Sequence, residues 1–232
     1  GLNVVALERG PMQDTYPDGN YPQVIDELTY SVRKKLFQDV SKETVTIRHS
    51  INDVALPNRQ LGVFLPGNGV GGAGLHWSGV HFRVDPMELR MRSHYEERYG
   101  KKFIPEGMTI QDFGVSYEEL EPFFDYAEKV FGTSGQAWTV NGQLVGEGKG
   151  GNPYAPDRSD NFPLLSQKNT YSAQLFQKAA NDVGYKPYNL PSANTSGPYT
   201  NPYGAQMGPC NFCGFCSGYV CYMYSKASPN VN

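Results

Sequence analysis

The clearest repeating pattern of apolar and polar positions lies in residues 116–131, SYEELEPFFDYAEKVF. Apolar side chains recur there every three or four positions, which predicts an amphipathic helix. Ser116 and Glu119 have the spacing of a capping box at its start, and Pro122 predicts a kink inside it. An apolar stripe of this kind is typical of core packing, so we expect one side of the helix to be buried: Leu120, Phe123, Phe124, Ala127 and Phe131.

Three other segments carry helical spacing or the end signals of a helix. Residues 22–37 repeat apolar side chains at helical spacing after an initial proline, and their expected role is packing. Residues 85–100 begin with Asp-Pro, a cap followed by a residue suited to the first turn, and end near a glycine. Residues 172–183 are followed by Gly184 in the C-cap position. These segments are the remaining predicted helices.

Short apolar runs predict the strands. Residues 3–7, NVVAL, form a continuous run that ends at Glu8, as expected of a buried parallel strand. Residues 43–47 alternate in the manner of a strand, and residues 61–65 are a second short apolar run. Asn-Gly within residues 140–143 predicts a tight hairpin. Long loops are predicted for most of residues 132–165 and for residues 187–209, which are rich in glycine, proline and asparagine.

Residues 67–83, GNGVGGAGLHWSGVHFR, are the first candidate for chemistry, and we call them the glycine segment. Glycines lack a Cβ, so backbone N–H groups in such a run can approach a ligand closely. The run follows the predicted strand at residues 61–65, which suggests a strand end that opens into an anion-binding loop. A surface turn with no ligand explains the glycines equally well, and the segment alone does not decide between them.

We call residues 210–229 the cysteine segment, because its first twelve residues contain four cysteines. Their spacing is C-x2-C-x2-C-x4-C, at Cys210, Cys213, Cys216 and Cys221. Disulfides between such close neighbours would be strained, and structural zinc usually takes two separated pairs of ligands. The spacing is closer to the ferredoxin run C-x2-C-x2-C-x3-C, although its last gap is one residue longer and Tyr222 replaces the proline. The spacing favours an iron–sulfur cluster over zinc, as [4Fe–4S] or as [3Fe–4S] with one thiol left over.

Composition narrows the class of protein. The 232 residues are 39% hydrophobic and 19% charged, as in an ordinary globular protein, and the net charge of −3 argues against a nucleic-acid partner. No apolar run approaches the roughly 20 residues that cross a bilayer, and no secretory signal is recognised. The chain starts at Gly1 without methionine, so we expect both ends to be cut from a longer protein.

Six motifs in order resemble the glucose–methanol–choline (GMC) oxidoreductases, in particular the catalytic subunits of membrane-bound dehydrogenases that oxidise gluconate and related sugars. They span nearly the whole chain, and a chance match of all six is not credible. The motifs are VVALERG at 4–10, the glycine segment, DFGVSYEELEPFFDYAEKVFGTSG at 112–135, GNPYAPDRSDNFP at 151–163, SANTSGPYTNPYG at 192–204 and CNFCGFCSGYVCYMYSKASP at 210–229.

The resemblance implies FAD as cofactor, with Glu8 at the adenosine ribose and the glycine segment beside the pyrophosphate and the flavin ring. His76 lies where some relatives carry a histidine joined covalently to the flavin, and a histidine that only stacks near the ring is the open alternative. Arg83 is expected to be a structural or phosphate-side charge. The implied flavin-binding residues are Glu8, Arg9, Gly67, Gly69, Val70, Gly71, Gly72, Ala73, Gly74, His76 and Trp77, and the implied cluster ligands are Cys210, Cys213, Cys216 and Cys221.

The implied fold is α/β: a partial Rossmann-type FAD-binding domain at residues 1–110, a partial substrate or cap domain at 111–209, and an iron–sulfur segment at 210–232 that returns toward the FAD domain. The GxGxxG turn is expected before Gly1 and the catalytic histidine after the last residue. No catalytic base can therefore be named, and this chain alone is expected to be inactive. Where flanking strands are missing, apolar surface is expected to be exposed.

The implied reaction is oxidation of a secondary alcohol of an aldonate such as gluconate, or of a sugar or polyol. Electrons would pass through the iron–sulfur cluster to a cytochrome c subunit and quinone. A small export-assisting subunit is the other implied partner, and the implied location is the periplasmic face of the bacterial inner membrane. The alternative from another class is a binding module in which the cysteines hold structural zinc.

Overall fold

The computed structural model describes residues 2–14, 36–39, 42, 45–48, 51–58, 66–229 and 231. Its helices are α2 (Pro86–Leu89), α3 (Met91–Tyr99), α4 (Tyr117–Phe131) and α5 (Tyr171–Asp182), with short 3-10 helices η1 (Gly72–Leu75) and η2 (Lys101–Phe103). Its strands are β1 (Val45–Ile47), β2 (Leu56–Asn58), β3 (Ser134–Gly135), β4 (Thr139–Val140), β5 (Gln143–Leu144), β6 (Leu164–Leu165), β7 (Tyr199–Thr200) and β8 (Gln206–Met207).

The strands form four separate pairs rather than one sheet. β1 pairs with β2, β4 with β5 and β7 with β8, all antiparallel, whereas β3 and β6 are parallel. Helices and strands are both present, in keeping with the predicted α/β class. Within the described ranges, parallel pairing of named strands is confined to β3 and β6, so the Rossmann arrangement stays a prediction.

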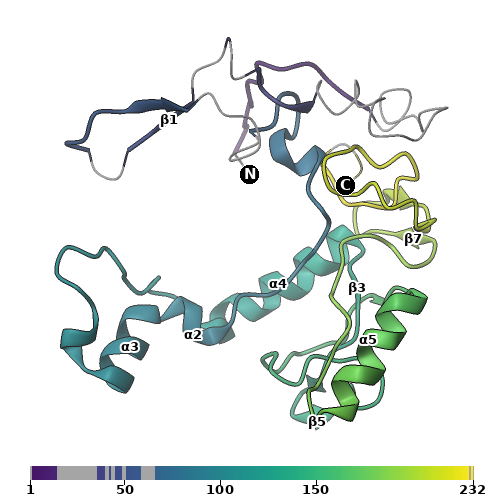
Figure 1. The fold of residues 1–232 in the computed structure, drawn as a ribbon. Coiled ribbons are helices and arrows are strands. Elements are labelled where there is room, and N and C mark those ends of the chain that lie inside the picture. Colours follow the sequence, from purple (N-terminus) through teal and green to yellow (C-terminus); the bar gives the residue numbers. More distant parts are fainter. Residues whose placement is uncertain are drawn as a thin grey trace.

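The described elements are arranged along an open curve (Figure 1). The β1–β2 hairpin and the glycine segment lie toward one end, α2 and α3 toward the other, and α4 leads back to the region of α5. The C-terminal segment, yellow in Figure 1, returns beside η1. Leu36, Leu75 and Val220 form a small core where these distant parts of the chain meet. None of the described helices is long and apolar enough to span a bilayer.

The helix predicted at residues 116–131 is confirmed as α4, but its expected apolar core is not. The Ser116 hydroxyl accepts from Glu119 N, the Glu119 carboxylate accepts from Ser116 N, and the helix runs through Pro122. Phe123 is 70% exposed, whereas the most buried side chain of α4 is Glu128, at 2%. The apolar stripe is only partly covered because the inward side of α4 faces a buried group of charges.

Two other predicted helices differ from the structure in detail. The helix expected at residues 85–100 begins at the Asp85 cap and ends before Gly100 as predicted, but it is not continuous: α2 and α3 are separated at Arg90, whose φ of −128° lies outside the helical region. The predicted cap at Asp85 is confirmed, because its carboxylate accepts from Met87 N. Helix α5 begins one residue early, after a Thr170 cap, and Gly184 has the left-handed φ (84°) expected of a C-terminal glycine.

The strand predictions are partly right. Residues 45–47 are in β1 as expected, and the Asn-Gly hairpin is confirmed by β4 and β5, with φ of 50° at Asn141 and 74° at Gly142. The strand predicted at residues 3–7 is wrong, because those residues form no strand and Leu7 is 95% exposed. A buried strand needs neighbours on both sides, and no described pair includes this run. Most of residues 22–37 and all of residues 61–65 lie outside the described part of the chain.

Apolar side chains are exposed at several places, as the sequence led us to expect. They occur in the N-terminal run, on the outer side of α4, on α5 and after it. Strongly exposed examples in these places are Leu2, Val4, Val5, Leu7, Phe123, Phe176 and Val183.

Candidate cofactor site

The backbone of the glycine segment needs glycine for its own conformation. Gly69, Gly71 and Gly72 have φ of 133°, 93° and 52°, a region that side chains with a Cβ rarely adopt. The turn they form leads into η1 and then to His76 and Trp77. Several of its N–H groups bond within the chain: Val70 N to Pro11 O, Gly72 N to Gly69 O, Gly74 N to Gly71 O and His76 N to Ala73 O.

Close packing explains most of the glycines. A Cβ on Gly71 would lie 2.7 Å from the ring of Pro229, and one on Gly74 would lie 3.0 Å from the same ring. A Cβ on Gly69 would lie 2.7 Å from the carbonyl oxygen of Pro11. A Cβ on Gly72 meets nothing within 4 Å. The backbone at Gly72 is therefore the part of this loop that a ligand could approach most closely, while its neighbours serve contacts inside the chain.

The N-terminal residues implied for ribose binding lie against this loop. A Cβ on Gly10 would lie 2.2 Å from Gly69 N, so the two backbones touch. Glu8 is exposed, and its carboxylate accepts from Gly10 N at 2.7 Å. Arg9 is exposed beside it. The structure thus brings the Glu8 region and the glycine loop together, and the Glu8 carboxylate also stabilises its own turn.

His76 and Trp77 point into the chain. The His76 side chain is 9% exposed, and its ring packs edge-on against Phe37 with 4.5 Å between ring centroids. The Trp77 indole Nε1 donates to Ala227 O at 2.7 Å. Both residues therefore connect the glycine segment to parts of the chain that are distant in sequence.

The four cysteines are free thiols, each partly buried. The turn that carries them has left-handed backbone at Phe212, Gly214 and Gly218. Cys210 Sγ accepts from Phe212 N at 3.4 Å, and Cys216 Sγ lies 3.9 Å from Asn194 Oδ1. Among the described residues, no group of three or more His, Cys, Asp or Glu side chains is arranged closely enough to hold a metal ion.

The pKa values of two of the thiols are raised by burial and by the neighbouring cysteines. Burial raises the pKa of Cys216 to about 11, nearby Lys226 opposes the rise, and charge repulsion from the other three cysteines adds to it. Burial likewise raises the pKa of Cys210. Thiolate, not thiol, is the form that binds metal, so binding must release these protons. The donor set fits a thiolate-bound centre chemically, although the side chains have not converged on one point.

The glycine and cysteine segments are in direct contact. Gly218 N donates to His76 O at 2.7 Å, and Val220 packs with Leu75 in the small core. Lys226, at 1% exposed, lies at the same junction, and burial lowers its pKa to about 8 against the charges of the cysteines. The two segments that sequence motifs single out are thus neighbours in space.

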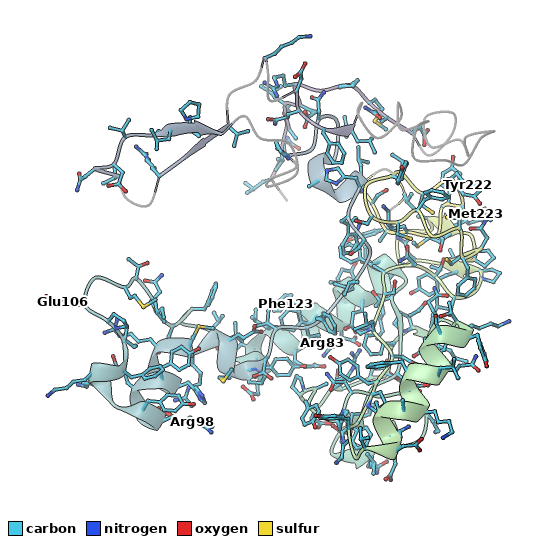
Figure 2. The ribbon with its side chains drawn as sticks, viewed as in Figure 1. Arg83, Arg98, Glu106, Phe123, Tyr222 and Met223 are labelled. Atoms are coloured by element: carbon cyan, nitrogen blue, oxygen red, sulfur yellow. The ribbon has the colours of Figure 1, made fainter. Side chains whose placement is uncertain are left out.

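A buried charged group next to α4 was not predicted as a unit. Arg83 and Arg158 both bind the Glu128 carboxylate, and Arg83 also donates to Glu121 at 2.8 Å. Burial by itself would lower the pKa of Arg83, but hydrogen bonds and charge from Glu128 outweigh it and raise that pKa. Figure 2 shows Arg83 beside α4, with Phe123 also labelled on that helix. Arg83 is therefore a structural charge, one of the two roles expected for it.

The same group forms one wall of a cavity of about 350 Å³ that the sequence did not reveal. Aromatic, amide, acidic and small apolar side chains supply the rest of its lining, so the cavity combines apolar surfaces with hydrogen-bonding groups. No local sequence motif predicts this cavity, because its walls come from four separate stretches of chain. Its lining includes Phe82, Arg83, Gln136, Tyr154, Arg158 and Tyr188.

Comparisons with known proteins show which proteins the chain is similar to. No family model matches it. It is 78% identical over all 232 residues to the gluconate 2-dehydrogenase flavoprotein of Pantoea cypripedii, of whose length it spans 38%. It is also 29% identical over 131 residues to the fructose dehydrogenase large subunit of Gluconobacter japonicus, a match that covers 56% of this chain and 20% of that protein. The chain is therefore a relative, along its whole length, of part of the gluconate 2-dehydrogenase flavoprotein, and the resemblance inferred from its motifs is confirmed.

Proposed function

We propose that this chain forms the cofactor-facing part of an FAD-dependent dehydrogenase that oxidises a secondary alcohol of an aldonate such as gluconate. The identity of 78% across the whole chain to a gluconate 2-dehydrogenase flavoprotein is the observation that carries this proposal. Contact between the glycine and cysteine segments supports it, because a dehydrogenase with two redox groups needs them close together.

The glycine segment is proposed to bind FAD. Glu8 and Arg9 are exposed and the backbone at Gly72 is open, so these are the groups that a nucleotide could reach. His76 and Trp77 are more buried and contact other parts of the chain. Bound FAD would supply the acceptor for the hydride that leaves the alcohol carbon. The base that takes the hydroxyl proton is proposed to lie outside this chain.

The role of His76 is proposed as either a covalent attachment point or a packing residue next to the flavin. Its burial against Phe37 supports a packing contribution in both cases. The intact protein distinguishes the two: after acid precipitation, a covalent flavin stays in the pellet and keeps its fluorescence. A His76→Ala variant should release it only if the attachment is at this residue.

The cysteine segment is proposed to hold an iron–sulfur cluster, [3Fe–4S] or [4Fe–4S], that carries electrons toward a cytochrome c subunit and quinone. The spacing of Cys210, Cys213, Cys216 and Cys221 supports this proposal, and so does their common position beside the glycine segment. A small export-assisting subunit and the periplasmic face of the inner membrane complete the proposed setting.

A sugar or polyol is the second candidate substrate. The similarity to a fructose dehydrogenase large subunit favours it, although that match spans only 56% of this chain. Purified intact protein separates the candidates through dye reduction with gluconate, fructose and a polyol as parallel donors. Gluconate is expected to give the highest kcat/KM, and faster turnover of fructose would assign the protein to the second candidate.

The same preparation tests the zinc-module alternative. We expect yellow-brown protein that contains FAD, iron and acid-labile sulfide. Colourless protein with one bound zinc and no flavin would contradict the dehydrogenase proposal and favour a structural module.

A further inference from the structure

The junction between the glycine and cysteine segments is built around one buried ammonium group. Lys226 is 1% exposed, and its Nζ donates to three backbone carbonyls: Trp77 O at 2.8 Å, Cys216 O at 2.8 Å and Tyr219 O at 2.7 Å. An ammonium group has three N–H donors, so all of its hydrogen bonds are accounted for. A buried cation is tolerated only with such compensation, which implies that these three carbonyls hold a definite position around it.

The three carbonyls belong to both segments. Trp77 lies in the glycine segment, 149 residues before Lys226, whereas Cys216 and Tyr219 lie in the turn that carries the cysteines. Two other hydrogen bonds cross the junction in parallel, from Gly218 N to His76 O and from Trp77 Nε1 to Ala227 O, both at 2.7 Å. The junction therefore joins the two segments through the backbone carbonyls of His76 and Trp77 on one side and backbone groups of the cysteine turn, including the carbonyl of Cys216, on the other.

We propose that Lys226 is a positioning residue, whose ammonium group, together with the Trp77 indole, clamps the cysteine turn onto the glycine segment. The clamp fixes the cysteines relative to the loop next to His76. Because the rate of electron transfer depends steeply on distance, the clamp would matter for electron transfer, and this consequence rests on the proposed function. The existence of the clamp does not, because it follows from hydrogen bonds within the chain.

Other contacts of the cysteine segment are independent of Lys226 and supply internal controls. Residues 225–227 also bond to residues 193–195, through Thr195 N to Ser225 O at 3.0 Å and Ala227 N to Ala193 O at 2.8 Å. These bonds do not involve Nζ. Removal of the ammonium group should therefore loosen the cysteine turn while it leaves the adjacent backbone pairing in place.

The test is hydrogen exchange followed by mass spectrometry on the intact protein as purified. Lys226→Met keeps a long apolar side chain and removes all three donors. We expect peptides that contain Gly218 to exchange on the order of tenfold or more faster, because each hydrogen bond from a charged group is worth roughly a tenfold change or more. Peptides that cover α4 and Ala227 should be unchanged. Lys178→Met, which removes a lysine that is 74% exposed, is the matched control.

A second variant keeps the test decisive if Lys226→Met does not accumulate. Trp77→Phe removes only the bond to Ala227 O and should accelerate exchange at the junction by a smaller factor. The clamp would be overturned if Lys226→Met left the exchange rate at Gly218 unchanged, or if it accelerated exchange in α4 equally. If only Trp77→Phe can be made, an unchanged exchange rate at the junction would overturn it.

Cofactor analysis separates this proposal from the proposed function. Where the wild-type protein contains iron and sulfide, Lys226→Met should alter the electron paramagnetic resonance signal of the cluster, and Lys178→Met should not. An identical signal in Lys226→Met and wild type would also overturn the positioning role. Wild-type protein without flavin or iron would refute the proposed function, while the exchange pattern would still decide the clamp.

Discussion

Arg83 grips the carboxylate of Glu128 with two hydrogen bonds, Nε to Oε1 at 2.9 Å and Nη2 to Oε2 at 3.0 Å, although the residues are 45 positions apart. Arg158 binds the same carboxylate from another loop. Glu128 is 2% exposed and Arg158 5% exposed, so this contact is shielded from water and salt. It connects the glycine segment, α4 and the loop before β6 in one buried group.

Neutralising Glu128 should destabilise the protein strongly. Glu128→Gln leaves buried Arg158 without a carboxylate and leaves Arg83 with only that of Glu121. Breaking a buried ion pair in this way costs roughly 3–5 kcal/mol. Urea denaturation would measure the loss in free energy of unfolding. Glu97→Gln is the matched control, because the Glu97 pair with Arg90 is exposed and should contribute about 1 kcal/mol or less. Similar losses in the two variants would contradict a stabilising role for the buried group.

His81 should make the protein less stable in acid. Burial lowers the pKa of His81 below 6.5, Glu128 opposes the shift, and Arg83 and Arg158 reinforce it. The unfolded chain therefore binds this proton more readily than the folded one, so stability falls as pH drops from 6.5 toward the folded pKa. Well above pH 6.5 the histidine is neutral in both states and contributes no pH dependence.

The histidine prediction is checked by urea denaturation between pH 5 and pH 8. His81→Gln should keep a partner for Thr133, whose hydroxyl lies 2.9 Å from His81 Nδ1, and should show a weaker fall in stability with acid. His94→Gln, in α3 and outside the buried Glu128 group, serves as the control variant. Parallel pH profiles for His81→Gln and wild type would show that another group is responsible.

Alanine substitutions in the glycine loop should differ in their cost. Gly71→Ala combines a left-handed φ of 93° with a Cβ only 2.7 Å from Pro229, so either the loop or Pro229 must move. Gly72→Ala meets open space, and its φ of 52° costs about 1–2 kcal/mol. We expect Gly71→Ala to be the more destabilising, as measured by urea denaturation. If FAD approaches at Gly72, Gly72→Ala should lower flavin content more than its effect on stability explains, and full flavin content would argue against approach there.

Serine substitutions of the cysteines should reveal which thiols bind iron. Replacement of a ligand should remove nearly all iron and acid-labile sulfide from the intact protein, because serine lacks the soft thiolate that the cluster requires. Four sensitive positions favour [4Fe–4S], and three sensitive positions with one tolerant favour [3Fe–4S]. Ser217→Ala, an exposed neighbour, should retain full iron content. Full iron in all four serine variants would contradict the cluster assignment.

Local signals in the sequence were sufficient for several elements. The capping box of α4, the C-terminal glycine of α5 and the Asn-Gly hairpin are confirmed because each depends on hydrogen bonds or φ angles within a few residues. The ordered set of motifs was also sufficient for the resemblance to a dehydrogenase flavoprotein, which the identity of 78% confirms. The roles assigned to individual flavin and cluster residues stay predictions.

Pattern alone failed where partners from elsewhere in the chain decide the outcome. An apolar run such as residues 3–7 becomes a buried strand only when neighbouring strands cover it, and no described pair does. The expected apolar side of α4 is partly exposed because the helix instead buries Glu128 between two arginines. Nothing near Glu128 in the sequence identifies Arg83 or Arg158 as its partners.

The glycine and cysteine segments show the same division. The sequence alone determined that the glycine segment can form a tight turn and that the cysteine segment presents four thiols within twelve residues. Tertiary structure decided that the two lie in contact, that Gly69, Gly71 and Gly74 pack against Pro11 or Pro229, and that Lys226 occupies the junction. Hydrogen bonds across 149 residues leave no local pattern, because their geometry exists only after the chain has folded.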